Sequence, residues 1–438
     1  MYKKPTFDSF AFGCRVNEAE KLEIDRQMDA LGYAQSEADP DIYIINTCSV
    51  TKKAEREARQ LILKLKSSNP HLKLVVTGCS ATYWRKNGLY SKLPIDLLIE
   101  NINKTYTARL IHKRFSSDCP QISPTSPEPL IMDKFLSSGR LMIKIQDGCH
   151  RFCTYCIVPY LRGTPHSIKV IDLLTTIETY DSKNIKEVIY TAINTEAFGH
   201  DTKETLVELI NASISKTKIP RISFGSIHPW SINPELIACY EHNIKSKRLS
   251  NFFHIPLQSS SDKMLQLMKR GYKANEIQER LIRLSRIFPN TPTSPKTLIA
   301  TDIIVGFLEE TDKDFEDTYQ FLEKSPISKV HVFRFSSRQN TAADYMKKKL
   351  REPTDAEKKR RAKALIELSF QKFSSFQNKN VGVVSNGLFI GRITDGYQTA
   401  IMLNQLQVQI PVKKSLRGTM KRVTITEFKK GKLIGKFT

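Results

Sequence analysis

The chain has 438 residues, of which 40% are hydrophobic and 26% are charged, and this composition is ordinary for a soluble globular protein of two or three domains. It has no run of about 18 apolar residues, which excludes a transmembrane helix of the usual length. Residues 1–5 lead into a short strand rather than an apolar signal-peptide region, so we expect a cytoplasmic protein with no membrane partner.

Positive charge dominates the composition: 68 Lys and Arg residues stand against 45 Asp and Glu residues, giving a formal net charge of +23. Neutralisation of phosphates by such side chains supplies most of the affinity of proteins for nucleic acids. The excess therefore favours a nucleic-acid partner, although it also fits a solubility requirement or a lysine-rich proteome.

Strand and helix patterns alternate over the first hundred residues, which are the core of a predicted domain 1–115. This alternation predicts a parallel α/β sheet. The expected strands are 9–12, 41–45 and 72–76, and the expected helices are 18–31 and 53–66.

A cysteine follows the end of each of these strands: Cys14, Cys48 and Cys79. The carboxyl ends of parallel strands share one edge of a sheet, so we expect the three thiols to converge. One cysteine in such a position is usually a small buried hydrophobe. Three in three consecutive units favour a three-thiolate metal site.

Prolines and serines are concentrated after residue 115, which predicts a linker at 116–133. We interpret Cys119, which lies inside it, as incidental. Six strand–helix units follow in the predicted domain 134–352 and indicate a partial (βα)6 barrel. Their strands are expected at 140–146, 187–192, 221–226, 252–257, 298–307 and 330–335, and helices at 171–179, 234–242, 264–269, 274–287 and 315–322. Cys239, in one of these helices, is assigned to the core.

The loop after the first of these strands carries Cys149, Cys153 and Cys156 in a C-x3-C-x2-C arrangement. Three thiolates can hold most of a metal centre and leave one position open. A closed zinc site would need a fourth ligand, such as His150, but adjacent Cys149 and His150 cannot easily aim at one ion. A 4Fe–4S cluster with one iron free for S-adenosylmethionine fits the spacing better.

The remaining chain divides into a charged helical connector at 353–378 and a glycine-broken tail at 379–438. The short apolar runs of the tail predict a β-barrel of about five strands, the size of an OB-like module. The tail holds 11 Lys and Arg residues and 2 Asp and Glu residues, so we expect it to bind RNA; the alternative is a purely structural cap.

Several longer blocks resemble the radical S-adenosylmethionine methylthiotransferases. Residues 147–163 read DGCHRFCTYCIVPYLRG, which is close to the signature of that family. The resemblance covers nearly the whole chain, and the basic tail is similar to the family's RNA-binding TRAM domain. The other matching blocks are GCRVNE at 13–18, NTCSVT at 46–51, VTGC at 76–79, FHIPLQS at 253–259 and TDIIVGF at 301–307.

The resemblance implies two 4Fe–4S clusters. Cys149, Cys153 and Cys156 would hold the radical-generating cluster, with Tyr155 against the adenine of S-adenosylmethionine. An auxiliary cluster, bound by Cys14, Cys48 and Cys79, would carry the sulfur. S-adenosylmethionine would be both methyl donor and radical source, and no catalytic residue beyond the cluster ligands is expected.

The implied reaction is insertion of a methylthio group at carbon 2 of an adenosine in tRNA. The blocks at 13–17 and 153–160 look most like the branch that acts on N6-threonylcarbamoyladenosine at position 37, beside the anticodon. An electron donor and a sulfur source would be further partners. The alternatives are the same reaction on isopentenyladenosine, methylthiolation of a ribosomal protein, and a zinc-dependent RNA-binding protein.

The chain departs from the family pattern on the S-adenosylmethionine and substrate side of the expected barrel. Thr164–Ser167 replaces an arginine-rich segment, and Leu308-Glu309 replaces Pro-Gly. Ser260 stands where the family has glycine, and residues 191–194 lack the usual glycine. These departures put rate or substrate detail in question, but they leave both cysteine sets intact.

Overall fold

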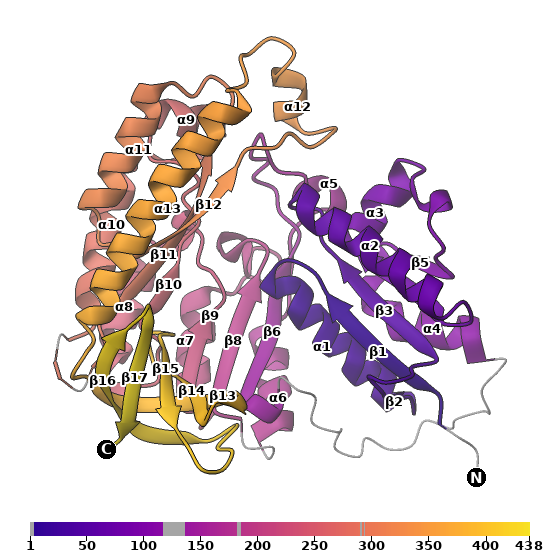
Figure 1. The fold of residues 1–438 in the computed structure, drawn as a ribbon, viewed down its shortest axis with the longest axis horizontal. Helices are drawn as coiled ribbons and strands as arrows, with labels where there is room; N and C mark the ends of the chain where they lie inside the picture. Colours follow the sequence, from indigo (N-terminus) through magenta and orange to yellow (C-terminus); the bar gives the residue numbers. More distant parts are fainter. Residues whose placement is uncertain (1–3, 117–135, 182–184, 290, 293) are drawn as a thin grey trace. The chain divides into compact units, whose positions relative to one another are not determined.

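The structure, a computed structural model, describes residues 4–116, 136–181, 185–289, 291–292 and 294–438 (Figure 1). The chain forms two compact units. The first holds the residues up to 116 with 147–150 and 156–164; the second holds 136–146, 151–155 and the chain from 165 onward. Cys119 and the predicted linker from residue 117 lie outside the described residues.

A parallel five-stranded sheet forms the centre of the first unit, in the order β2-β1-β3-β4-β5. Its strands are β1 (Thr6–Ala11), β2 (Ala34–Gln35), β3 (Ile42–Thr47), β4 (Lys73–Gly78) and β5 (Leu97–Ile99). Its helices are α1 (Arg15–Ala30), α2 (Lys52–Ser68), α3 (Cys79–Lys86) and α4 (Thr107–Phe115).

Helices cover both faces of this sheet because the strands carry apolar side chains on both sides. Ile44 of β3 packs in one cluster with residues of α1 and α4, whereas its neighbour Ile45 packs in another with residues of α2 and α3. Trp84 of α3 is fully buried in the second cluster. The predicted parallel α/β sheet is confirmed.

Six parallel strands form the open barrel of the second unit. They lie in two sheets, with orders β7-β6-β8-β9 and β10-β11-β12, joined by a bridge between Ile222 and Leu249. The strands are β6 (Arg140–Asp147), β8 (Glu187–Ala192), β9 (Arg221–Phe224), β10 (Phe252–His254), β11 (Leu298–Val305) and β12 (Lys329–Arg334), with β7 (His166–Ser167) at the edge.

Helices lie outside the barrel strands, as Figure 1 shows. They include α7, which the sequence patterns missed, and Cys239 is buried in α8 as expected. The helices of the second unit are α6 (Val170–Asp181), α7 (Leu206–Lys216), α8 (Pro234–Asn243), α9 (Asp262–Leu267), α10 (Ala274–Ile287), α11 (Asp312–Lys324), α12 (Ala342–Met346) and α13 (Asp355–Asn378), whereas α5 (Val158–Arg162) belongs to the first unit.

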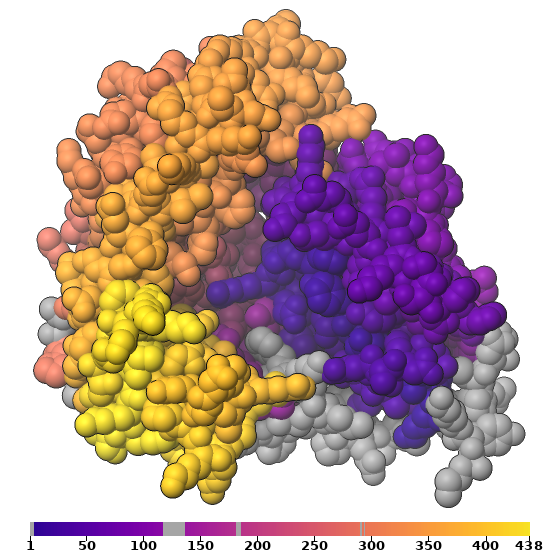
Figure 2. Space-filling model, in the orientation of Figure 1, coloured from indigo at the N-terminus to yellow at the C-terminus, as the bar shows by residue number. Residues whose placement is uncertain are grey.

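The C-terminal residues form a closed five-stranded barrel in the order β13-β14-β15-β17-β16, and it is coloured yellow in Figure 2. Its strands are β13 (Val384–Thr394), β14 (Tyr397–Ile401), β15 (Gln407–Pro411), β16 (Met420–Lys429) and β17 (Lys432–Phe437). The predicted β-barrel of about five strands is confirmed. Its strand β13 passes through Gly387, whose missing side chain leaves room for Ala400.

A buried polar network joins this C-terminal barrel to the starts of strands β6, β8 and β9 of the open barrel. Glu187, with no exposed surface, accepts hydrogen bonds from Arg140 (2.8 Å) and Gln405 (2.7 Å). Arg221 donates to the carbonyl oxygens of Ile401 and Asn386, each at 3.2 Å. Among the described residues, no helix is both long and apolar enough to cross a membrane.

Candidate functional site

The three N-terminal thiols converge beyond the ends of three adjacent strands. Cys14 precedes α1, Cys48 follows β3, and Cys79 opens α3 directly after β4. Gly13 has a φ of +89°, and a side chain there would come within 2.5 Å of the Cys48 Sγ. Glycine is therefore required, and the Cys14 and Cys48 segments are in close contact.

Hydrogen-bond donors surround the sulfurs of this set. The backbone N–H of Val50 lies 3.5 Å from Cys48 Sγ, and Asn101 Nδ2 lies 3.5 Å from Cys79 Sγ. Burial, with a smaller contribution from the neighbouring Cys14 and Cys79, raises the pKa of the Cys48 thiol to about 12. A metal centre would displace that proton. Three thiols with N–H donors and one exposed member, Cys14, fit a cluster with one accessible iron.

Arg162 of α5 is the centre of a buried ionic network beside Cys79. Its Nε donates to Cys79 Sγ at 3.3 Å, and its Nη1 donates to Glu20 and Asp147, each at 2.8 Å. Asn17 accepts from Nη2 at 2.9 Å. Burial alone would lower the pKa of Arg162, but Cys79, Glu20 and Asp147 together raise it. The guanidinium therefore stays charged next to the thiol.

The ends of the loop that carries the second cysteine set belong to the same unit as Arg162. Gly148 has a φ of +75°, and a side chain there would come within 2.1 Å of the Thr164 carbonyl oxygen. The N–H of Cys149 donates to the Gly163 carbonyl at 3.1 Å. The loop is thus closed at its base by backbone contacts that only glycine at position 148 permits.

The middle of this loop is held by the segment that follows α9. Thr154 donates from its N–H to the Met268 carbonyl (3.2 Å) and from its hydroxyl to the Leu267 carbonyl (2.8 Å). Arg270 Nη1 donates to Cys153 Sγ at 3.3 Å and to the Tyr155 hydroxyl at 3.2 Å. A second buried arginine therefore contacts a thiol of the second set.

A histidine–aspartate group lies on three neighbouring barrel strands. His254 Nε2 and Asp302 Oδ1 are 2.9 Å apart, and Asp302 is the register partner of His331. One ligand atom from each of the three lies within 4.8 Å of the others. His254 and Asp302 stand within two of the matching blocks, but no role was predicted for them, because no spacing along the chain links three separate strands.

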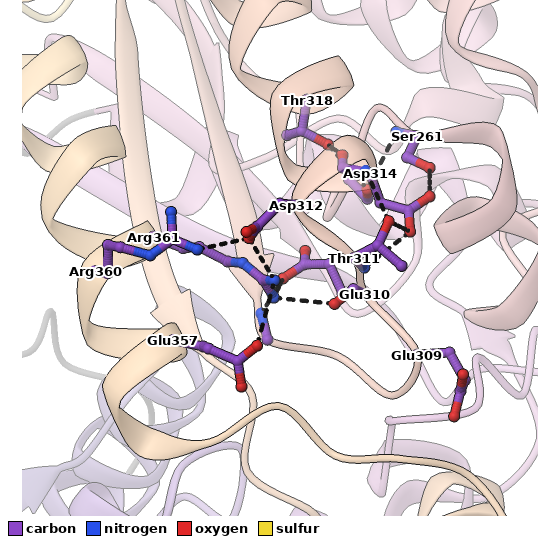
Figure 3. A network of polar contacts seen from close by, with 12 residues as sticks. Ser261, Glu309, Glu310, Thr311, Asp312, Asp314, Thr318, Glu357, Arg360 and Arg361 are labelled. Carbon is purple, nitrogen blue, oxygen red and sulfur yellow. Dashed lines mark hydrogen bonds and ion pairs between the residues drawn. The ribbon is translucent and has the colours of Figure 1, made fainter.

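The departure at Leu308-Glu309 is accommodated by a polar network (Figure 3). Glu309 adopts a φ of +59°, the left-handed conformation for which glycine is better suited. Buried Glu310 accepts from Arg361 at 2.8 Å, and Ser261 donates to Asp314 at 2.9 Å. The turn at Glu309 is followed directly by α11, whose N-cap is Thr311.

The segment Thr164–Ser167, which departs from the family pattern, contributes a short strand to the barrel. His166 and Ser167 form β7 beside β6, and the N–H of Ser167 donates to Asp201 at 2.9 Å. At the end of β8, the N–H of Asn194 donates to the Gln146 side chain at 2.9 Å. In both segments a backbone N–H therefore donates to a polar side chain from another part of the barrel.

Comparison with known proteins identifies the family. Residues 6–100 match the "Uncharacterized protein family UPF0004", and residues 143–322 match the "Radical SAM superfamily". Over 386 residues the chain is 32% identical to "Threonylcarbamoyladenosine tRNA methylthiotransferase MtaB" of Aquifex aeolicus, which covers 86% of this chain and 91% of that protein. The chain belongs to the radical S-adenosylmethionine methylthiotransferases, in the branch that includes MtaB.

The chain is also similar to other radical S-adenosylmethionine proteins. "tRNA-2-methylthio-N(6)-dimethylallyladenosine synthase" of Syntrophobacter fumaroxidans is 30% identical over 345 residues, covering 76% of each chain. The structure of the radical S-adenosylmethionine methyltransferase TsrM from Kitasatospora setae aligns with a TM-score of 0.53 at 13% identity, over 76% of this chain and 73% of that one. The latter similarity supports the fold alone.

The radical S-adenosylmethionine family implies S-adenosylmethionine and a 4Fe–4S cluster as cofactors. The six cysteines were predicted from the sequence as site residues, whereas Arg162, Arg270 and Glu20 were not. Arg162 stands in the quoted block at 147–163, whereas Arg270 stands in no quoted motif. Glu20 carried one usable signal: a carboxylate three residues after Asn17 places two polar groups on the same face of a helix.

Proposed function

We propose that this enzyme inserts a methylthio group at carbon 2 of N6-threonylcarbamoyladenosine at position 37 of tRNA. The observation that carries the proposal is the pair of three-thiol sets, each with a guanidinium N–H donating to one of its sulfurs at 3.3 Å. A chain that only binds RNA needs no such sets. The choice of N6-threonylcarbamoyladenosine as the substrate follows from the name of the relative from Aquifex aeolicus.

Cys149, Cys153 and Cys156 would hold the radical-generating 4Fe–4S cluster, and Cys14, Cys48 and Cys79 would hold an auxiliary one. When bound, the two clusters and S-adenosylmethionine supply the radical, the methyl group and the sulfur. Tyr155, whose hydroxyl is fixed by Arg270, would lie against the adenine of S-adenosylmethionine. Within the N-terminal unit, Arg162 keeps Cys79 and Asp147 in one network, so it positions the residue that precedes Gly148-Cys149.

The C-terminal barrel would bind the tRNA. Its segment from residue 379 carries 11 Lys and Arg residues against 2 Asp and Glu residues, and Tyr397 exposes 39% of its surface for stacking on a base. Methylthiolation of a ribosomal protein would not need this excess of positive charge. A low-potential electron donor and a sulfur source complete the requirements of the reaction.

Cluster content tests the assignment of the six cysteines. After anaerobic reconstitution we expect about eight irons per chain, since each set would hold four. Alanine at Cys149, Cys153 and Cys156 together, or at Cys14, Cys48 and Cys79 together, should each leave about four. Cys239→Ala is the matched control, because that buried thiol lies in α8, and it should leave the iron content unchanged. A colourless zinc protein would contradict the proposal.

The relative from Syntrophobacter fumaroxidans favours one second candidate, the same reaction on isopentenyladenosine. Anticodon stem-loops that carry either nucleoside distinguish the two. Reconstituted enzyme with S-adenosylmethionine and a chemical reductant should convert the threonylcarbamoyl substrate at least tenfold faster. The reverse preference, read by mass spectrometry of the nucleosides, would move the enzyme to the other branch.

A further inference from the structure

Arg270 is held rigidly in a left-handed turn after α9. Lys269 and Gly271, on either side of it, have φ angles of +58° and +71°. The N–H of Arg270 donates to the Leu265 carbonyl at 2.9 Å, and only 3% of the residue is exposed. Its guanidinium carbon lies 4.3 Å from the centroid of the Trp230 ring. Burial and the contact with Trp230 therefore fix the orientation of the Arg270 side chain.

Each guanidinium nitrogen of Arg270 is used. Nε donates to the Tyr272 hydroxyl at 3.1 Å, and Nη2 donates to the Pro256 carbonyl at 2.7 Å. Nη1 faces Cys153 Sγ at 3.3 Å and the Tyr155 hydroxyl at 3.2 Å. In the described part of the chain, no carboxylate lies within ion-pair distance of this cation.

A buried cation without an anion is costly, because burial removes its hydration and nothing replaces it. Three other buried arginines differ in this respect: Arg162 pairs with Glu20 and Asp147, Arg361 pairs with Glu310, and Arg221 lies in the network of Glu187. The missing anion of Arg270 is supplied if Cys153 is a cluster ligand. A 4Fe–4S core with three thiolates carries net negative charge, and one-electron reduction increases it.

We propose that Arg270 is a positioning residue that raises the reduction potential of the radical-generating cluster through its hydrogen bond and charge at Cys153. The proposal rests on the proposed function, because it requires Cys153 to be a ligand. Charge and N–H···S bonds close to a cluster favour its reduced form. By donating to Tyr155 as well, Arg270 couples the cluster to the residue expected against the adenine.

A redox titration of a single-cluster protein tests this role. The parent is the full-length chain with alanine at Cys14, Cys48 and Cys79, which retains only the second cysteine set. After anaerobic reconstitution, sodium dithionite supplies one electron per cluster, and the reduced cluster is measured by electron paramagnetic resonance at each solution potential. At the parent's midpoint, Arg270→Gln should lower the ratio of reduced to oxidised cluster about tenfold, which corresponds to about 59 mV.

Two further variants separate charge from packing. Arg270→Lys keeps the charge but not the fork of donors, so its midpoint should lie between those of the parent and Arg270→Gln. Arg283→Gln is the matched control: it makes the same substitution at an exposed arginine of α10, outside the cysteine loop. Its midpoint should equal that of the parent.

The outcomes are distinguishable. A full iron content and an unchanged midpoint in both Arg270 variants would overturn the role of Arg270 while leaving the proposed function intact. If Arg270→Gln fails to hold iron, the midpoint of Arg270→Lys decides, and a value equal to the parent's overturns the proposal. A parent that binds no cluster would overturn the ligand assignment itself, and with it both proposals.

Discussion

At the scale of single residues, a buried arginine beside one thiol of each set determines the electrostatic surroundings of that set. Arg162 contacts Cys79 and two carboxylates, so its charge is compensated within the protein. Arg270 contacts Cys153 and no carboxylate among the described residues. The two clusters would therefore experience different electrostatic surroundings, which suits two centres with different chemical tasks.

Replacing Arg162 by methionine should destabilise the iron-free protein by about 3–5 kcal/mol, because Asp147 would lose this buried cation and Glu20 would keep only Lys104 of its two cations. Urea unfolding measures the loss. The control is Arg26→Met, in which an exposed pair with Glu23 is removed and the change should stay below about 1 kcal/mol. Equal effects of the two substitutions would show that the network contributes little to stability.

At the scale of elements, the cysteine positions followed from the alternation of strands and helices. Cys14, Cys48 and Cys79 were predicted to converge because parallel strands end at one edge, and the structure brings them together. The short strands β2 and β5 and the helices α3, α4 and α7 were missed. Cys79 follows the end of its strand, as predicted, and it is also the first residue of α3.

The arginine contacts could not be predicted from the sequence, for a physical reason. Arg162 and Glu20 are separated by 142 residues, and Arg270 and Cys153 by 117. Periodicity reports only the face of an element that is buried, and not which distant element meets it. The same limit applies to His254, Asp302 and His331, which meet only because β10, β11 and β12 are neighbours.

The network of Glu187 connects elements and should make stability depend on pH. Burial alone would raise the pKa of Glu187, but Arg140 and Arg221, with hydrogen bonds from Ser223 and Gln405, lower it from its ordinary 4.5. A depressed pKa contributes stability above pH 4.5 that is lost as pH falls through the folded-state pKa.

Glu187→Gln should therefore lower the free energy of unfolding at pH 7 by about 3–5 kcal/mol and reduce its decline on acidification. Urea unfolding of the iron-free protein at pH 7 and pH 4 measures both effects. Glu367→Gln, which removes an exposed carboxylate of α13, serves as the control and should behave like the original protein. An unaltered pH dependence in Glu187→Gln would contradict the assigned charge of Glu187.

At the scale of the whole molecule, the positive charge of the chain should act through the C-terminal barrel. Alanine at Lys421, Lys432 and Lys436, all exposed there, should weaken tRNA binding and flatten its dependence on salt. Each lost phosphate contact reduces the slope of log K against log salt by about 0.7–0.9. Fluorescence anisotropy with labelled tRNA at several salt concentrations measures the slope.

The matched control places the same charge change elsewhere on the surface. Alanine at Lys216, Lys218 and Lys245, which are exposed on and after α7 and α8, should leave the slope unchanged. If both triple variants change the slope equally, RNA is attracted by the net charge of the protein and the barrel has no special role.

Nucleoside mass spectrometry of cellular tRNA tests the central claim most directly. The chain is expressed in cells that lack their own methylthiotransferase for threonylcarbamoyladenosine, beside its variant with alanine at Cys149, Cys153 and Cys156. We expect 2-methylthio-N6-threonylcarbamoyladenosine in the tRNA of cells that express the unaltered chain, and none in the tRNA of cells that express the variant. An unmodified threonylcarbamoyladenosine pool with an iron-loaded, unaltered chain would contradict it.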